Sequence, residues 1–137
     1  MAYKKIIGIT MGDPASIGPE ITVKALSDPA LYERCRPLVI GDAAVMKEAR
    51  IIVGREDIQI HTVRSVSECL FEAGIIDVYD LGIADMSALE RGKISAEAGE
   101  AAFQYVKKVI ELAMAGEIDA TVTNALNKEA INLAGHH

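Results

Sequence analysis

The sequence predicts an α/β fold in which helices cover both faces of a mostly parallel sheet. Short apolar runs alternate with helical patterns along the 137 residues, and Gly, Pro or Asp punctuate the boundaries between them. Half of the residues are hydrophobic but only 4% are aromatic, so aliphatic side chains must fill the core. Strands covered on both faces have this composition. The length is sufficient for one packed domain, and the hydrophobic content excludes a disordered chain.

The first half of the chain contains two strand-then-helix units. Residues 4–10 form a nearly continuous apolar run, followed by a Gly/Pro-containing loop and a helix that begins near Pro19 and stops before Asp28. Residues 37–41 predict a second strand, after which Asp42 can cap a helix. Two strand-and-helix alternations therefore come before residue 53.

The second half continues the pattern with three more strands. Residues 58–63 alternate apolar and polar side chains, which indicates a strand near an edge of the sheet. Residues 75–81 predict another strand, and the irregular stretch at 82–95 predicts a surface loop. Residues 118–123 have the pattern of a buried strand that turns directly into a helix from about residue 127.

A long helix between Ser95 and Gly116 is the clearest element of the sequence. Ser95 is a good cap residue, and Gly116 is a typical residue just after a helix. The apolar residues in between recur at steps of three and four, which predicts a face packed on the sheet. They are Ala98, Ala101, Ala102, Tyr105, Val109, Leu112 and Ala113.

Composition excludes several classes of function. The net charge is −6 and no basic run exceeds a pair, so we expect no nucleic-acid partner. No signal peptide and no stretch long enough to span a membrane is present, and Cys35 and Cys69 lack a Cys-x-x-Cys spacing. We therefore expect a cytoplasmic protein with two reduced, structural thiols and no membrane partner.

Histidine and serine patterns give no catalytic assignment. His61 lies in the alternating strand, where we expect it to be exposed, and the adjacent His136 and His137 would make a poor metal site. No His/Cys/Asp cluster has metal-ligand spacing, and Gly-x-Ser-x-Gly is absent.

Two groups of polar residues follow predicted strands and are the candidate site. Gly12 and Asp13 come after the first strand, and Asn124, Asn127 and Lys128 come after the last one. Open α/β sheets bind ligands at the carboxyl ends of their strands, so the two groups could line one cleft.

Each candidate also has a purely structural explanation. The loop with Gly12 matches neither the dinucleotide-binding nor the Walker fingerprint, so it could be a tight turn before a helix. Lys128 could contact an anion at a helix N-terminus or be solvated, and Asn124 or Asn127 could bind a substrate or cap the helix.

Three stretches, in the same order, resemble the 4-hydroxythreonine-4-phosphate dehydrogenase (PdxA) family. Residues 9–20 (Ile-Thr-Met-Gly-Asp-Pro-Ala-Ser-Ile-Gly-Pro-Glu) are similar to its N-terminal signature, and residues 92–102 to its Gly-x-x-Ser-x-x-x-Gly-x-x-Ala helix entry. Residues 119–130 (Asp-Ala-Thr-Val-Thr-Asn-Ala-Leu-Asn-Lys-Glu-Ala) resemble its strand-to-helix segment.

The resemblance implies a fold like that of isocitrate and isopropylmalate dehydrogenases, with two α/β/α domains, an active-site cleft between them and a homodimeric assembly that shares the site. It also implies NAD-dependent oxidation of a 4-phosphorylated, four-carbon 3-hydroxy acid, followed by decarboxylation. A divalent cation (Zn, Mg, Co or Mn) suits this chemistry, because it can polarise the hydroxyl and carboxylate oxygens. Family members are more than twice as long, so residues 1–137 correspond to their N-terminal part. Their metal ligands and main substrate contacts follow later, which leaves no catalytic or metal-binding residue to assign in this chain.

One position departs from the family's pattern, and one stretch bears on its branch. Ser16 stands where many relatives have Gly, which argues against a role that needs a positive φ there but could supply a hydroxyl. Residues 123–128 (Thr-Asn-Ala-Leu-Asn-Lys), with Asn127 where the enzymes of vitamin B6 synthesis often have His, resemble the branch acting on 4-phospho-D-threonate, which gives dihydroxyacetone phosphate and CO2. The alternatives are 4-hydroxy-L-threonine 4-phosphate as substrate, a non-catalytic ligand-binding fragment, or an acyltransferase of related fold that acts on acyl phosphates.

Overall fold

One parallel sheet organises the protein. The computed structural model describes residues 3–84, 95–124 and 135. Within these residues the strand order is β3-β4-β2-β1-β5, and every neighbouring pair is parallel. The strands are β1 (Ile6–Thr10), β2 (Arg36–Gly41), β3 (Gln59–Val63), β4 (Ile75–Asp80) and β5 (Ala120–Val122). The predicted α/β fold is confirmed, and the predicted strand near an edge is the edge strand β3.

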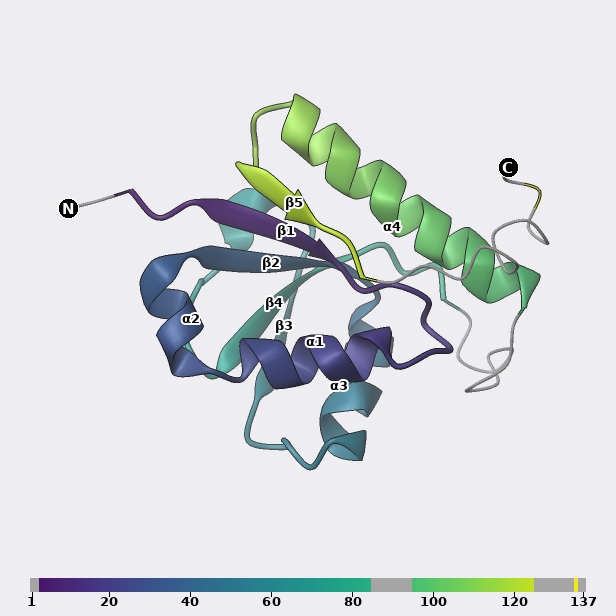
Figure 1. Ribbon diagram of the computed structural model, residues 1–137, viewed down its shortest axis with the longest axis horizontal. Helices are drawn as coiled ribbons and strands as arrows, with labels where there is room; N and C mark the ends of the chain where they lie inside the picture. The colour runs from purple at the N-terminus through teal and green to yellow at the C-terminus, as the bar shows by residue number, and fades with distance from the viewer. Residues whose placement is uncertain (1–2, 85–94, 125–134, 136–137) are drawn as a thin grey trace.

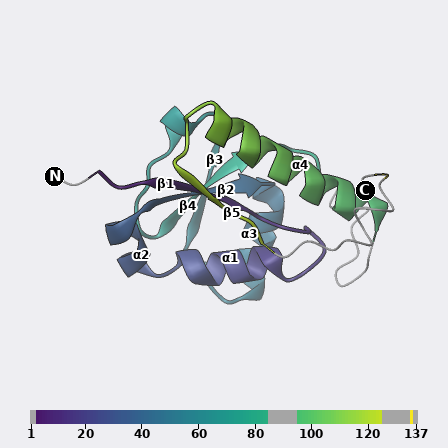
Figure 2. The same ribbon diagram turned by 45° about the horizontal axis from the view of Figure 1, so that its top comes forward.

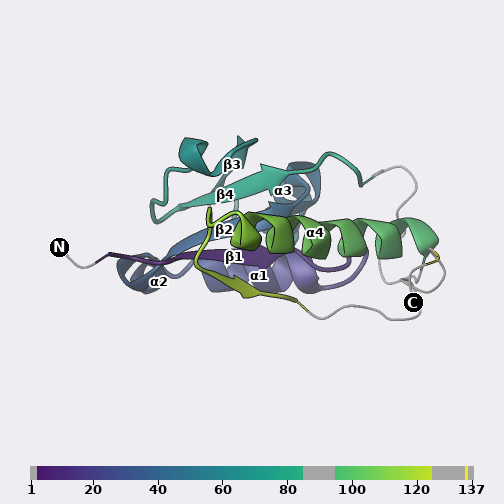
Figure 3. The same cartoon turned by 90° about the horizontal axis from the view of Figure 1, so that it is seen from above.

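Helices lie on both faces of this sheet (Figure 1). The helices are α1 (Gly18–Leu26), α2 (Pro29–Arg34), α3 (Ala43–Ile52) and α4 (Ala96–Met114), with a short 3-10 turn at Val66–Glu68. On one face α4 contacts β1, β2 and β5 and runs along the central strands (Figure 3). On the other face α1 packs beside α3, which also contacts β3 and β4. The three layers are those that the sequence predicted.

The core is aliphatic and is centred on β2. Leu38, Val39 and Ile40 are consecutive and all fully buried. Because alternate residues of a strand point to opposite faces, this burial requires helices on both sides. No helix within the described ranges is long and apolar enough to cross a membrane.

α4 forms as its sequence predicts. The Ser95 hydroxyl accepts a hydrogen bond from the backbone N–H of Ala98 at 3.1 Å, and the predicted stripe packs on the sheet with Ala113 at its half-buried margin. Gly8 of β1 lets the helix approach closely: a Cβ there would lie 2.8 Å from Val109 Cγ2 and 2.6 Å from Ile118 Cδ1.

Two local predictions differ from the structure. Within the strand predicted as buried at 118–123, Ile118 is buried, but the three residues of the short strand β5 are exposed, because in the described part of the chain β5 lies at the sheet edge and pairs with β1 alone. The sequence analysis also missed α2, which begins where α1 has ended. Asp28 accepts a hydrogen bond from the Ala30 N–H at 3.0 Å, and Pro29 fits the first turn because its missing N–H needs no partner there.

Two further predictions fall on segments outside the described residues. They are most of the loop at 82–95 and the helix expected from about residue 127.

Candidate functional site

The carboxyl ends of β1 and β5 lie next to each other, so the two predicted groups of polar residues meet at one edge. β1 and β5 are parallel neighbours with Ile9 opposite Val122. The loop after β1 and the chain leaving β5 emerge at the same end of the sheet, where α1 begins (Figures 1 and 2). This edge is where open α/β sheets bind ligands.

Asn124 ties β5 to both β1 and α1. Its backbone N–H donates to Thr10 Oγ1 at 3.2 Å. Its side-chain nitrogen donates to the Thr10 carbonyl at 2.7 Å and to Thr22 Oγ1 at 2.8 Å. Thr10 and Thr22 are both buried. The two protons of the amide nitrogen are thus used within the protein, which leaves the amide oxygen as the atom that could meet a ligand.

Asp13 folds the loop after β1 back on itself. Its side chain is 3% exposed, and Oδ1 accepts a hydrogen bond from the Ala15 N–H at 2.8 Å. Its carbonyl accepts from the N–H and the hydroxyl of Ser16. Burial raises the pKa of Asp13 above its ordinary value, and the Ala15 hydrogen bond opposes that shift. Gly12 has φ +83°, a backbone angle that favours glycine and makes this turn possible.

Gly18 closes the loop by a close backbone approach. A Cβ at this position would lie 2.6 Å from the Met11 carbonyl oxygen. The space around this glycine is therefore filled by the protein's own backbone. The tight-turn explanation of the loop fits Gly18, whereas Asp13 still places a carboxyl group at the strand end.

The structure adds a second polar cluster that the sequence analysis missed, at the ends of β2 and β4. Asp42 occupies the cap position of α3 but makes no capping bond; its carboxylate accepts from the Tyr105 hydroxyl and from the Ala84 N–H instead. The Ala43 N–H at the start of α3 donates to Asp80 Oδ1 at 3.1 Å. Burial, and then the negative charge of Asp42, raise the pKa of Tyr105 far above its ordinary value, so this hydroxyl stays a proton donor.

A signal for this cluster is visible in the sequence, since Asp42 and Asp80 each follow or end an apolar strand. The Tyr105 partner was not predictable, because it comes from a helix 63 residues away.

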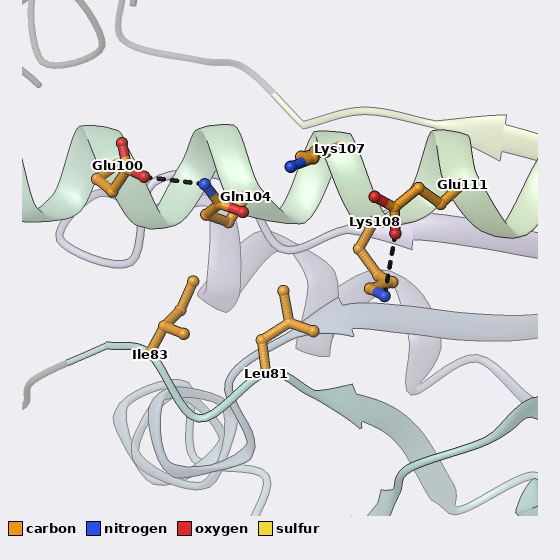
Figure 4. A pocket seen from close by; sticks show the side chains of 7 residues that line it. All are labelled: Leu81, Ile83, Glu100, Gln104, Lys107, Lys108 and Glu111. Carbon is orange, nitrogen blue, oxygen red and sulfur yellow. Dashed lines mark hydrogen bonds and ion pairs between the residues drawn. The ribbon is translucent and has the colours of Figure 1, made fainter. Parts of the chain in front are cut away.

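An open pocket of about 450 Å3 lies between α4 and the chain leaving β4 (Figure 4). Leu81 and Ile83 point towards α4, whose polar side chains line the other wall: Glu100, Gln104, Lys107, Lys108 and Glu111. Lys108 forms an ion pair with Glu111 at 3.1 Å, and Gln104 donates to Glu100 at 2.9 Å. The charges are mixed, so the pocket lacks the excess of cations that a phosphate group requires.

His61 is not fully exposed, contrary to the prediction. Its side chain is 35% exposed, and Nδ1 lies 2.8 Å from Oδ1 of the buried Asp77, its register partner on β4. Asp77 also accepts from the N–H groups of Leu70 and Phe71, which holds the chain before β4. Cys35 and Cys69 are both free and half-buried.

Of the five predicted site residues, the structure brings three to the same edge of the sheet. Gly12 and Asp13 lie in the loop after β1, and Asn124 is hydrogen-bonded to Thr10, the last residue of that strand. Asn127 and Lys128 lie outside the described residues. Across 3–84, 95–124 and 135, no group of three His, Cys, Asp or Glu side chains is placed to hold a metal ion.

Comparison with known proteins identifies relatives of this chain. The family described as pyridoxal phosphate biosynthetic protein PdxA matches residues 33–137. A protein of Symbiobacterium thermophilum with the provisional name D-threonate 4-phosphate dehydrogenase is 47% identical over 98% of this chain and 40% of its own length. A protein of Clostridium botulinum with the same provisional name is 44% identical over 97% of this chain and 41% of its own length.

A solved structure extends the match to three dimensions. The crystal structure of a 4-hydroxythreonine-4-phosphate dehydrogenase from Burkholderia phymatum superposes with a TM-score of 0.94 and 47% identity, over 98% of this chain and 40% of that chain. The chain thus spans about 40% of the length of the relatives that it matches. With the family matching more than half of its residues, the chain belongs to the PdxA family.

Proposed function

We propose that this chain is the N-terminal part of an NAD-dependent dehydrogenase that oxidises and decarboxylates 4-phospho-D-threonate, giving dihydroxyacetone phosphate and CO2. The observation that carries the proposal is the 47% identity, over nearly the whole chain, to a relative named for D-threonate 4-phosphate. Asn127, where the vitamin B6 enzymes often have His, supports the same branch. The first alternative substrate is 4-hydroxy-L-threonine 4-phosphate, and the superposed crystal structure is named for 4-hydroxythreonine 4-phosphate.

We assign substrate binding to Asn124, Asn127 and Lys128. The tie between Asn124 and β1 supports this role, because it fixes the start of the segment that carries Asn127 and Lys128. The Lys128 ammonium and the Asn127 amide nitrogen are donors suited to a phosphate or carboxylate oxygen at the carboxyl end of a sheet, whereas the Asn124 amide oxygen is an acceptor suited to a substrate hydroxyl. Gly12 and Asp13 form the neighbouring wall of the proposed cleft, with Asp13 presenting its buried carboxyl group.

The divalent cation and NAD belong to the proposal for the whole enzyme. The described residues provide no ligand set for a metal ion. Gly18, at the start of α1, lies so close to the Met11 carbonyl that no space is left beside it for a cofactor phosphate. We therefore assign neither group to a residue of this chain, and we place the homodimer and the shared active site in the full-length protein.

The test uses the full-length protein with NAD and each of the two phosphorylated substrates, in the presence of Mg²⁺, Mn²⁺, Co²⁺ or Zn²⁺. NADH absorbance should rise with 4-phospho-D-threonate and should rise much less with 4-hydroxy-L-threonine 4-phosphate. The opposite preference would move the protein to the vitamin B6 branch. Heat of substrate binding without NADH would favour a ligand-binding protein, and acyl transfer from an acyl phosphate would favour the transferase class.

A pair of variants tests the binding assignment. Lys128→Ala should raise KM for the phosphorylated substrate by about tenfold, a loss of roughly 1.4 kcal/mol, and leave KM for NAD unchanged. The matched control is Lys47→Ala, which removes an exposed lysine of α3 and should change neither constant. Equal effects of the two substitutions on KM would show that Lys128 does not bind the substrate.

A further inference from the structure

Thr22 lies in the middle of a hydrogen-bonded chain that joins the chain leaving β5 to the first turn of α1. Its side chain is 3% exposed. The hydroxyl accepts from the side-chain nitrogen of Asn124 at 2.8 Å and donates to the Gly18 carbonyl at 2.8 Å. Threonines within helices often donate to the carbonyl four residues earlier, so the second bond alone is ordinary. The bond from Asn124 is different, since it spans 102 residues of sequence.

This chain of bonds compensates for the weakness of β5. The strand has three residues, all of them exposed, and within the described ranges it pairs with β1 alone. The backbone hydrogen bonds between such a short edge strand and its neighbour do not fix the direction in which the chain leaves the strand. The Asn124 side chain supplies that constraint through Thr10 on one side and Thr22 on the other. Linked hydrogen bonds away from water also polarise and strengthen one another.

We propose that Thr22 is a positioning residue for substrate binding: it holds the Asn124 side chain in a fixed place relative to the loop of Asp13. This inference rests on the proposed function, because it assigns Thr22 to the same cleft. The hydroxyl has no role in contacting the substrate. It fixes the amide nitrogen of Asn124, so that the amide oxygen faces away from α1.

Replacing the Thr22 hydroxyl with a methyl group tests the inference in the full-length protein. Thr22→Val keeps the shape of the side chain but removes both the acceptor and the donor, whereas Thr22→Ser keeps the hydroxyl. Thr121→Val is the matched control, because Thr121 lies on β5 and is exposed. KM for the phosphorylated substrate, KM for NAD, kcat and Tm are measured for each variant.

We expect Thr22→Val to raise KM for the phosphorylated substrate by about tenfold, equivalent to roughly 1.4 kcal/mol, with KM for NAD and kcat changed less than threefold. Thr22→Ser should return KM to within about threefold of the wild-type value. A purely structural role would lower Tm without this split. Unchanged KM in Thr22→Val, or a failure of Thr22→Ser to restore it, would overturn the inference.

Hydrogen exchange separates this inference from the proposed function. Thr22→Val should speed exchange of the Asn124 amide, and Thr121→Val should not. If the wild-type protein produces no NADH with either substrate, the proposed function fails. The hydrogen-exchange measurement then tests by itself whether Thr22 positions Asn124. Equal exchange in Thr22→Val and wild-type protein would then contradict it.

Discussion

The hydrogen bond between Tyr105 and Asp42 is the most informative single contact to remove. Tyr105 of α4 is fully buried, and its hydroxyl donates to Asp42 Oδ2 at the end of β2. Tyr105→Phe keeps the ring in the core, so the change creates no cavity. What is lost is one hydrogen bond to a buried carboxylate, which typically contributes about 1.5–3 kcal/mol. We expect the variant to lose about 2 kcal/mol of unfolding free energy.

A double-mutant cycle isolates this bond. Asp42→Asn keeps the size of the side chain and leaves an oxygen that can still accept from the Ala84 N–H. If Tyr105 and Asp42 interact as the structure shows, the double variant should be more stable than the sum of the two single changes predicts, by about 1–2 kcal/mol. Urea denaturation of the full-length protein, monitored by far-ultraviolet circular dichroism, gives the changes in unfolding free energy of the two single variants and the double variant. Strict additivity would show that the bond contributes nothing to stability.

The same bond predicts a response to alkaline pH. Burial and the charge of Asp42 raise the pKa of Tyr105 above its ordinary value of 10.0, so the unfolded chain releases this proton first. The stabilisation is complete below pH 10 and decreases as the pH rises towards the folded-state pKa. Wild-type protein should therefore lose stability above pH 10 more steeply than Tyr105→Phe. Parallel stability curves for the two proteins between pH 9 and 11 would refute the reasoning.

Three further predictions concern other parts of the fold. Gly18→Ala should destabilise the protein by about 1–3 kcal/mol in a thermal melt, because the new Cβ would lie 2.6 Å from the Met11 carbonyl. Burial and the charge of Asp77 raise the pKa of Cys69 to about 12. Iodoacetamide at pH 8 should therefore alkylate this thiol on the order of a thousandfold more slowly in folded than in urea-unfolded protein, as followed by mass spectrometry. Val122→Lys should reduce the aggregation of residues 1–137 prepared alone, measured by light scattering, because Val122 is 52% exposed on an open sheet edge. Unchanged scattering would show that another surface causes the aggregation.

Elements that depend on local pattern could be predicted from the sequence. The short aliphatic run at 37–41 predicted a strand, and β2 occupies that run with Leu38, Val39 and Ile40 completely buried. Ser95 and the apolar stripe after it predicted α4 within one or two residues at each end. In both cases the signal lies within one element, where periodicity and capping are readable.

Features that depend on distant partners could not be predicted. Asp42 has the right position and residue type for a helix cap, yet its carboxylate bonds to Tyr105 and to Ala84. The apolar pattern of residues 118–123 resembled a buried strand, but burial depends on neighbours that a short window does not contain. His61 likewise gained a buried partner, Asp77, from the adjacent strand.

The polar residues at the carboxyl edge have a common structural effect. On one face Asn124 joins β5 to α1 through Thr22, and on the other face Asp42 joins β2 to α4 through Tyr105. Both helical layers are thus held to the strand ends by side-chain hydrogen bonds in addition to apolar packing. A binding site needs residues whose own positions are fixed by a supporting shell. The edge that carries Asp13 and Asn124 has such a shell on both faces, which is why we place the substrate there and not in the open, mixed-charge pocket beside α4.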